Sequence, residues 1–389
     1  MKTVGVICEF NPFHNGHKYL IESIRKQLGG CCIVGIMSGS FVQRGDVAIA
    51  DKFSRANAAL NNGVDLIAEL PTVYAVSSGE IFAKAGVSIA HNLGCNVMAF
   101  GVEGDRESLI KTAEIQSTEQ FKNQLKKQLT NGLSYPAAVE KSLVELWGKE
   151  NAEVLSGPNN ILGIEYIKAA KPLGIDILPI KRTGVHHDSH RTNGDFASAS
   201  QIRNMLLNND LHSFDYLPDY SYLSDPDSLC SVKNIEGALL YKLRTMTLGD
   251  FAVLPDVTEG LENRIFQAVK NYNSIPEIID AVKTKRYTHA RLRRIMIYAL
   301  LGITKEMQCF PVPYVRILGF NKPGEIALKS AAENCRLPII TRTANGLRQL
   351  DGISRTILEK DILASDILNL AKKSPQKCGD DYCKALIKA

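Results

Sequence analysis

Two histidines that flank a glycine near the amino terminus are the residues of this chain best suited to chemistry. His14 and His17 follow a short apolar, β-branched run at residues 3–8 and a proline-containing turn at 9–13. An amphipathic segment comes next, so the pattern predicts a strand, a turn and a helix that opens at the histidines. The start of a helix attracts anions, and Gly16 leaves room for a nucleotide beside the backbone. The arrangement favours phosphate chemistry over the alternative of a purely structural histidine pair.

A second polar motif, Ala-Ser-Ala-Ser-Gln-Ile-Arg at residues 197–203, begins about 180 residues after the first. Ser198 or Ser200 is a good N-cap for a helix. Arg203, one turn into that helix, has a planar fork suited to bidentate contact with phosphate oxygens. A surface helix can also start Ser-x-Ser without any function, so this motif depends on the first for its interpretation.

Together the two motifs resemble the signatures of the HxGH nucleotidyltransferase superfamily, which includes coenzyme adenylyltransferases and class I aminoacyl-tRNA synthetases. The first motif corresponds to His14-Asn15-Gly16-His17, and the second is usually Ile-Ser-Ser/Thr-x-x-Ile-Arg. The resemblance implies that His14 and His17 stabilise the charge that develops when a nucleophile displaces pyrophosphate from a nucleoside triphosphate. It also implies that Arg203 reaches the β and γ phosphates, which makes these three residues the expected catalytic set.

A narrower resemblance comes from Glu-Phe-Asn-Pro-Phe-His-Asn-Gly-His at residues 9–17, together with residues 37–45, 65–71 and 157–166. These stretches resemble the bacterial tRNA(Met) cytidine acetate ligase family. The resemblance implies an ATP-dependent ligase that forms acetyl-adenylate from acetate and ATP, with Mg²⁺ neutralising phosphate charge. The acetyl group would then pass to the exocyclic amine of the wobble cytidine of elongator tRNA(Met), giving N4-acetylcytidine.

Two other functions stay open at this point. A small-molecule adenylyltransferase in coenzyme synthesis would use the same two motifs, but the residues before His14 differ from that group. A non-catalytic RNA-binding protein could keep the fold, but the retention of both histidines and Arg203 argues against it.

The resemblance also implies ATP contacts along the first motif and at isolated positions downstream. Gly101 and Arg182 end two expected strands, and Asn159 and Asn160 open an expected helix; the sequence does not decide which asparagine contacts the nucleotide. The expected ATP-binding residues are Ile7, Cys8, Glu9, Phe10, Asn11, Pro12, Phe13, His14, Asn15, Gly16, His17, Lys18, Tyr19, Leu20, Gly101, Asn159, Asn160, Arg182, Ser198 and Ser200.

The alternation of apolar runs and amphipathic segments predicts an α/β fold. We expect a Rossmann-like nucleotidyltransferase domain with a parallel sheet at residues 1–210, and a mainly α-helical, tRNA-binding domain at 211–389. Glu69 lies in an apolar run, so it should pair with Arg44 or Lys52 or face the site. The later strands are expected at 31–37, 65–71, 96–103 and 176–182, a helical insertion at 106–155, short strands at 315–320 and 337–341, and a loose tail or short helix after Ser374.

The carboxyl-terminal part carries a basic run at residues 283–294, with six Lys or Arg and no acidic residue. Because the net charge of the chain is only +5, an RNA-binding surface must be a local patch of this kind rather than a property of the whole protein. Tyr287, within the run, could stack on a base. The expected tRNA-binding residues are Lys283, Lys285, Arg286, Arg291, Arg293 and Arg294.

Composition and local sequence argue against a secreted protein, a membrane protein and a resident metal site. Nine cysteines without a Cys-x-x-Cys pair suit the reducing cytoplasm, and no stretch has the character of a membrane span or signal peptide. Three histidines and an aspartate at residues 186–190 lie on one expected loop, which seldom closes a tetrahedral zinc site alone, so we expect no resident metal. The sequence shows no sign of an obligate protein partner.

Overall fold

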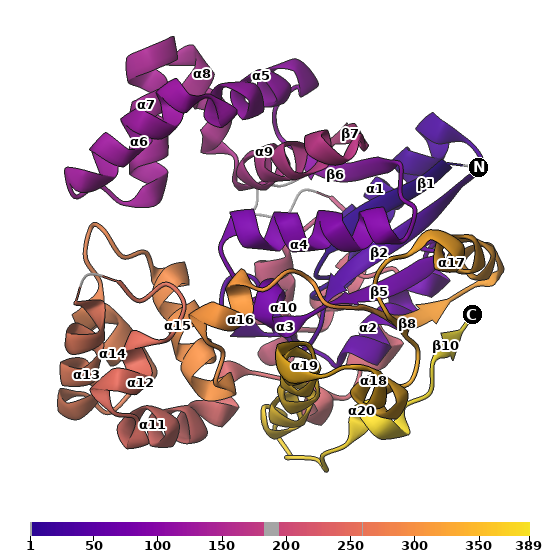
Figure 1. Cartoon of the computed structure of the whole chain (residues 1–389). Helices are drawn as coiled ribbons and strands as arrows, with labels where there is room; N and C mark the ends of the chain where they lie inside the picture. Colours follow the sequence, from indigo (N-terminus) through magenta and orange to yellow (C-terminus); the bar gives the residue numbers. More distant parts are fainter. Residues whose placement is uncertain (1, 183–193, 259) are drawn as a thin grey trace.

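The computed structural model describes residues 2–182, 194–258 and 260–389. In these residues a central sheet of eight strands has the order β10-β8-β5-β2-β1-β6-β7, and β9 pairs with β8 (Figure 1). Only the β5–β8 pair is antiparallel; the other pairs of this sheet are parallel. The strands are β1 (Lys2–Cys8), β2 (Cys31–Ser38), β5 (Leu66–Leu70), β6 (Val97–Val102), β7 (Asp176–Lys181), β8 (Val315–Phe320), β9 (Ile339–Ile340) and β10 (Ile387–Lys388).

Strand β1 lies between β2 and β6, with helices packed on both faces of the sheet. Alternate residues of β1 separate into two cores, as the two-residue period of a strand requires. Val4 and Val6 pack with Ile21 of helix α1, whereas Ile7 joins the core that contains Val87 of helix α4. The expected α/β class with a mainly parallel sheet is confirmed. The helices of this part are α1 (Asn15–Leu28), α2 (Lys52–Asn61), α3 (Thr72–Ala75), α4 (Gly79–Asn92), α9 (Pro158–Ala170) and α10 (Ala199–Leu207).

The expected helical insertion forms a lobe beside α9, away from the sheet (Figure 1). Phe121 and Leu143 anchor a small core of its own, because helices this short need tertiary packing to be stable. No helix in the described ranges is both long enough and apolar enough to cross a membrane. The lobe consists of α5 (Arg106–Ser117), α6 (Glu119–Thr130), α7 (Tyr135–Trp147) and α8 (Glu150–Glu153).

Residues after 210 contribute both a group of helices and part of the sheet. Strands β8, β9 and β10 come from this region, so the sheet draws on both sides of the boundary expected at residue 210. The division into domains 1–210 and 211–389 stays a prediction. The helices are α11 (Glu236–Thr245), α12 (Leu248–Ala252), α13 (Leu261–Asn271), α14 (Ile275–Val282), α15 (His289–Leu301), α16 (Lys305–Cys309), α17 (Lys322–Asn334), α18 (Thr343–Gln349), α19 (Gly352–Leu370) and α20 (Asp380–Cys383).

Short elements complete the chain. A two-stranded hairpin, β3 (Phe41–Val42) and β4 (Asp46–Val47), follows β2. The 3₁₀ turns are η1 (Val154–Ser156), η2 (Lys171–Leu173), η3 (Leu211–Tyr216), η4 (Ser221–Leu223), η5 (Pro226–Ser228) and η6 (Val232–Ile235).

A buried network of charges fastens the carboxyl-terminal tail to the sheet. Lys52 forms ion pairs with Glu69 and with Asp381, both at 2.8 Å, and Arg316 pairs with the same two carboxylates. All four side chains are almost completely buried. Glu69 therefore has the Lys52 partner that the sequence suggested, and Arg316 in addition. The sequence analysis expected either a loose tail or a short helix after Ser374, and the structure has the short helix α20 there.

Candidate active site

The histidine pair forms the amino-terminal cap of α1. Nδ1 of His14 accepts a hydrogen bond from the N–H of Gly16 at 3.0 Å, and the N–H of His14 donates to Nδ1 of His17 at 3.2 Å. The two imidazole rings stack with their centroids 3.8 Å apart. Because both Nδ1 atoms accept hydrogen bonds, the proton of each neutral ring lies on Nε2. The cap therefore sets the tautomer of both histidines.

Gly16 is required by the space that the His14 ring occupies. A Cβ added at Gly16 would lie 2.8 Å from Cε1 and 3.0 Å from Nδ1 of His14. Any side chain here would have to displace the ring from its cap. The glycine of the motif thus serves the histidine directly, in addition to the room for substrate expected from the sequence.

His17 is held in its neutral form by its surroundings. Burial lowers its pKa well below the usual value, and the neighbouring His14 and Arg182 lower it further. The ring of Phe10 packs edge-on against His17 with centroids 5.0 Å apart. Phe10 itself has a φ of 44°, which a bulky residue adopts only where the surrounding structure holds it.

The second motif is in contact with the first. Oγ of Ser198 caps α10 by accepting from the N–H of Gln201 at 3.2 Å, and it lies 3.3 Å from Oγ of Ser200. Nη1 of Arg203 donates to the main-chain carbonyl of Asn11 at 2.8 Å. The fold therefore brings together the two motifs that are far apart in the sequence.

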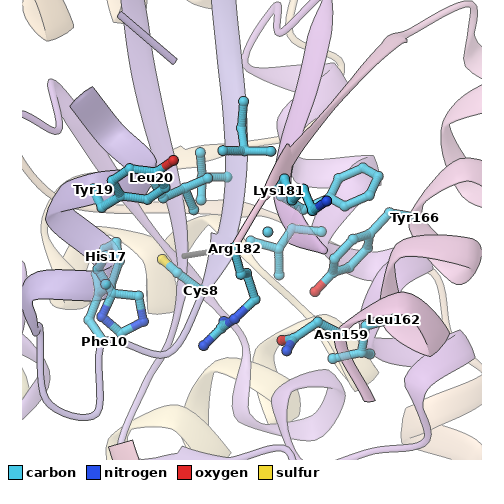
Figure 2. Close-up of a pocket in the computed structure, with 16 residues that line it drawn as sticks. Cys8, Phe10, His17, Tyr19, Leu20, Asn159, Leu162, Tyr166, Lys181 and Arg182 are labelled. Carbon is cyan, nitrogen blue, oxygen red and sulfur yellow. The ribbon is translucent and has the colours of Figure 1, made fainter. Parts of the chain in front are cut away.

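A pocket opens beside His17 at the carboxyl ends of β1, β6 and β7 (Figure 2). This is the edge at which open α/β sheets bind ligands. Ten of the residues expected to contact ATP line the pocket: Ile7, Cys8, Phe10, Gly16, His17, Tyr19, Leu20, Gly101, Asn159 and Arg182.

Six further lining residues were not predicted. Leu162 and Tyr166 follow Asn159 by three and seven positions in α9, so helical periodicity could have identified them. The others are strand residues that lie within two positions of a predicted residue, and they are Val6, Phe100, Ile180 and Lys181.

Arg182 lies in the pocket between His17 and Asn159 in the view of Figure 2. Gly101 provides the space for it, since a Cβ there would lie 3.2 Å from Cγ of Arg182. Burial lowers the pKa of Arg182, and the carboxylate of Glu103 opposes that change. The guanidinium keeps its charge, because an arginine pKa lies far above neutrality.

The two adjacent asparagines have different surroundings. Oδ1 of Asn160 accepts from the N–H groups of Glu103 and Gly104 at 2.9 and 3.0 Å, and its side chain is buried. It therefore fixes the loop after β6. Asn159 lines the pocket and donates to the side chain of Glu103. Asn159 is thus the asparagine with access to a ligand.

The remaining expected residues do not line the pocket, and some of them hold the chain around it in place. Oδ1 of Asn11 accepts from the N–H of Ile49 at 2.7 Å, and the N–H of Phe13 donates to the hydroxyl of Tyr222 at 3.2 Å. The side chain of Asn15 donates to the carbonyl of Asp195 at 2.9 Å. The expected residues outside the pocket lining are Glu9, Asn11, Pro12, Phe13, His14, Asn15, Lys18, Asn160, Ser198, Ser200 and Arg203.

Arg55 is a supporting residue that sequence reasoning missed. It is fully buried in α2 and donates to the carbonyls of Ala50, Glu9 and Ser38 at 3.0, 2.6 and 3.1 Å, and to that of Gly39. Glu9 follows β1, and Ser38 and Gly39 lie at the end of β2, so Arg55 ties the two strand ends together. The sequence feature that could have identified Arg55 is the position of an arginine within an alanine-rich helix.

The basic run is only partly exposed. Arg294 is buried and pairs with Asp256 at 2.8 Å, and Arg291 donates to the carbonyl of Asp256 at 2.9 Å. The guanidinium of Arg291 covers the ring of Tyr287, which is 6% exposed, so the expectation that this ring stacks on a base does not fit its burial. Lys283, Lys285 and Arg293 are exposed, and Arg286 is partly buried.

Metal binding finds no support in the described part of the chain, where no group of three or more His, Cys, Asp or Glu residues could hold an ion. The histidine-rich stretch at 186–190 lies outside the described residues.

Comparison with known proteins gives a consistent result. The model of the family described as HIGH Nucleotidyl Transferase matches residues 1–381. A tRNA(Met) cytidine acetate ligase of Thermoanaerobacter sp. (strain X514) is 38% identical over the whole of both chains, and one of Acetivibrio thermocellus is 34% identical over the same extent. One of Bacillus velezensis is 33% identical over 97% of this chain and 94% of its own.

Solved structures agree with these relatives. The crystal structure of Thermotoga maritima TmcAL without ligand superposes with a TM-score of 0.92 at 30% identity, covering 100% of this chain and 99% of that one. The same protein bound with alpha-thio ATP gives a TM-score of 0.91 at 30% identity and the same coverage.

Proposed function

This chain belongs to the HIGH nucleotidyl transferase family, and we propose that it is an ATP-dependent tRNA(Met) cytidine acetate ligase. Relatives with that name match it over nearly their full length. The observation that carries the proposal is the histidine pair with its Nδ1 atoms engaged by the cap of α1. The pair adjoins a pocket that also contains Arg182, and Arg203 of the second motif donates to the carbonyl of Asn11 in the turn before the pair.

In the first step an acetate oxygen attacks the α-phosphorus of ATP. The bond from that phosphorus to the bridging oxygen breaks, and pyrophosphate leaves with the electron pair. His17, neutral because its pKa is lowered, donates its Nε2 proton as a hydrogen bond to the phosphate oxygens that gain charge. Arg203, Arg182 and the serine hydroxyls of α10 hold the departing pyrophosphate. Positioning supplies much of the rate, since no covalent enzyme intermediate forms.

In the second step the exocyclic amine of the cytidine attacks the acetyl carbonyl, AMP leaves, and the amine gives up a proton. The apolar lining of the pocket, which includes Leu20, Phe100 and Ile180, limits the access of water to acetyl-adenylate. A wobble base is already in a loop, so it reaches the pocket by leaving its stack. The exposed Lys283, Lys285 and Arg293 contact the phosphate backbone of elongator tRNA(Met).

Mg²⁺ would accompany ATP as part of the substrate and would neutralise phosphate charge as pyrophosphate leaves. The described residues include no group of three or more His, Cys, Asp or Glu side chains that could hold the ion. Use of ATP and tRNA implies a cytoplasmic reaction, and nothing in the site requires a protein partner. Synthesis of a coenzyme precursor is not favoured, since the full-length relatives carry the ligase name.

Exchange of labelled pyrophosphate into ATP tests the first step, with acetate, longer carboxylates and phosphorylated coenzyme precursors as separate substrates. Acetate-dependent exchange, followed by mass-spectrometric detection of N4-acetylcytidine in tRNA(Met), supports the proposal. Exchange that depends on a coenzyme precursor instead would contradict it. In H17Q the glutamine retains the cap, so exchange should fall roughly 100-fold while tRNA affinity stays unchanged.

A further inference from the structure

Tyr166 is a polar residue of the pocket to which the mechanism above gives no role. It lies in α9 about two turns after Asn159, and it is only 6% exposed. Figure 2 shows its hydroxyl turned into the pocket, on the side of Asn159 and Arg182. No group in the described ranges forms a hydrogen bond with this hydroxyl. Because buried tyrosine hydroxyls usually have a partner, this one is suited to meet a ligand.

The ring of Tyr166 is held in place by its packing against β6. Its centroid lies 5.4 Å from that of the Phe100 ring, and the two planes meet at 59°. Gly163, about one turn earlier in α9, allows the helix to lie close to the strand, since a Cβ added there would lie 2.9 Å from Cε2 of Phe100. The hydroxyl therefore projects from a fixed ring, as the recognition of a small substrate requires.

The surroundings of the hydroxyl keep it neutral and able to donate. Burial raises the pKa of Tyr166 well above its usual value, and the charge of Glu9 raises it further. The pocket wall around the ring is apolar and includes Ile7, Phe100 and Leu162. A neutral donor beside an apolar wall fits a short carboxylate, whose oxygen accepts the hydrogen bond while its alkyl group packs on the wall. Unlike an arginine, such a donor does not compensate the negative charge that makes the carboxylate a nucleophile.

Acetate is the one reactant of the first step to which the mechanism above assigns no residue. We propose that Tyr166 is a specificity-determining residue for the carboxylic acid, and that its hydroxyl donates to one acetate oxygen while Leu162 and Phe100 contact the methyl group. The inference rests on the proposed function. The other acetate oxygen attacks the α-phosphorus beside His17, and the apolar wall limits the length of the alkyl chain.

Acetate-dependent exchange of pyrophosphate into ATP, with acetate and ATP varied separately, tests the role of the hydroxyl. Y166F keeps the ring and removes only the donor. It should raise the KM for acetate about tenfold or more, as expected for the loss of a hydrogen bond to a charged group, and leave the KM for ATP within about twofold. Y241F, in which the ring is exposed on α11, is the matched control and should behave as the unmodified protein.

A second variant tests the wall. L162A should raise the ratio of kcat/KM for propionate or butyrate to that for acetate about tenfold, because it makes room for further methylene groups. An unchanged ratio would overturn the assignment of the alkyl group to this wall.

The outcomes for Y166F separate this inference from the proposed function. An unchanged KM for acetate would overturn the inference, and so would a rise confined to the KM for ATP, which would place the hydroxyl on the nucleotide. Absence of acetate-dependent exchange in the unmodified protein would instead refute the proposed function, and this inference with it.

Discussion

At the scale of single residues, the site depends on how three neighbours constrain one another. His14 caps the helix, His17 completes the cap, and Gly16 leaves the space in which the His14 ring lies. The cap is therefore a structural feature that also selects the protonated nitrogen of each ring. A change that moves the His14 ring should damage catalysis without unfolding the protein.

Gly16→Ala tests that dependence. The added Cβ should displace the His14 ring and lower pyrophosphate exchange at least tenfold, because a small error in position is costly in an active site. Stability should change by less than about 1 kcal/mol, since alanine is the better helix former. Gly237→Ala in α11 is the matched control, as nothing lies near its added Cβ. Full activity of Gly16→Ala in the exchange assay would refute the role assigned to this glycine.

The lowered pKa of His17 makes a separate prediction about pH. The folded protein binds fewer protons at this ring than the unfolded chain, so its stability contribution is complete above about pH 6.5 and is lost as the pH falls below that value. Between pH 7.5 and 5 the loss should reach at most about 2 kcal/mol. H17Q should lose less over the same interval in urea unfolding. Identical pH profiles for the two proteins would show that His17 titrates normally.

At the scale of elements, α15 and the loop before it divide their basic residues between two roles. Arg291 and Arg294 hold the helix to Asp256, whereas Lys283, Lys285 and Arg293 face solvent. A basic run in the sequence therefore does not translate into an equally basic surface. Only the exposed members can contact RNA without disturbing the fold.

Replacement of Lys283, Lys285 and Arg293 by glutamine should weaken tRNA binding about tenfold or more at low salt and flatten its salt dependence. The melting temperature should hardly change. Arg294→Gln is the contrasting variant and should destabilise the protein by about 3 kcal/mol, because it leaves Asp256 without its ion pair. Filter binding across a salt series and thermal unfolding measure both effects. Unchanged RNA affinity in the triple variant would remove this surface from the proposal.

At the scale of the whole molecule, the carboxyl terminus completes the sheet that carries the site. Strand β10 pairs with β8, and Asp381 enters the buried network of Lys52, Glu69 and Arg316. Lys52 lies in the same helix as Arg55, which ties together the ends of β1 and β2. The tail thus supports the frame of the pocket from a distance.

Asp381→Asn should therefore destabilise the entire protein by about 3–5 kcal/mol, since it leaves two buried cations with one carboxylate fewer. Asp380→Asn, whose partner Lys384 is more exposed, is the control and should cost less than about 1 kcal/mol. Chemical unfolding measures both values. Equal, small effects would show that the network contributes little to stability.

The sequence by itself determined the motifs, the α/β class and the order of the main strands and helices in the first half of the chain. The four later strands of the first half occur within one residue of their predicted ends, because apolar runs bounded by turn residues are local signals. His14 and His17 were identified from their types and spacing, whereas the role of Arg203 was inferred from the family resemblance. The expectation that these residues lie in one site came from the family resemblance, because no local sequence pattern predicts it.

Only the tertiary structure decided which of these residues have access to a ligand. Asn159 lines the pocket while Asn160 is buried, and Arg293 is exposed while Arg294 is paired. Adjacent residues of one helix look alike in sequence, because burial depends on what packs against each face. The insertion of β8, β9 and β10 into the first sheet was likewise invisible, since strand pairing is a long-range contact that no local pattern encodes.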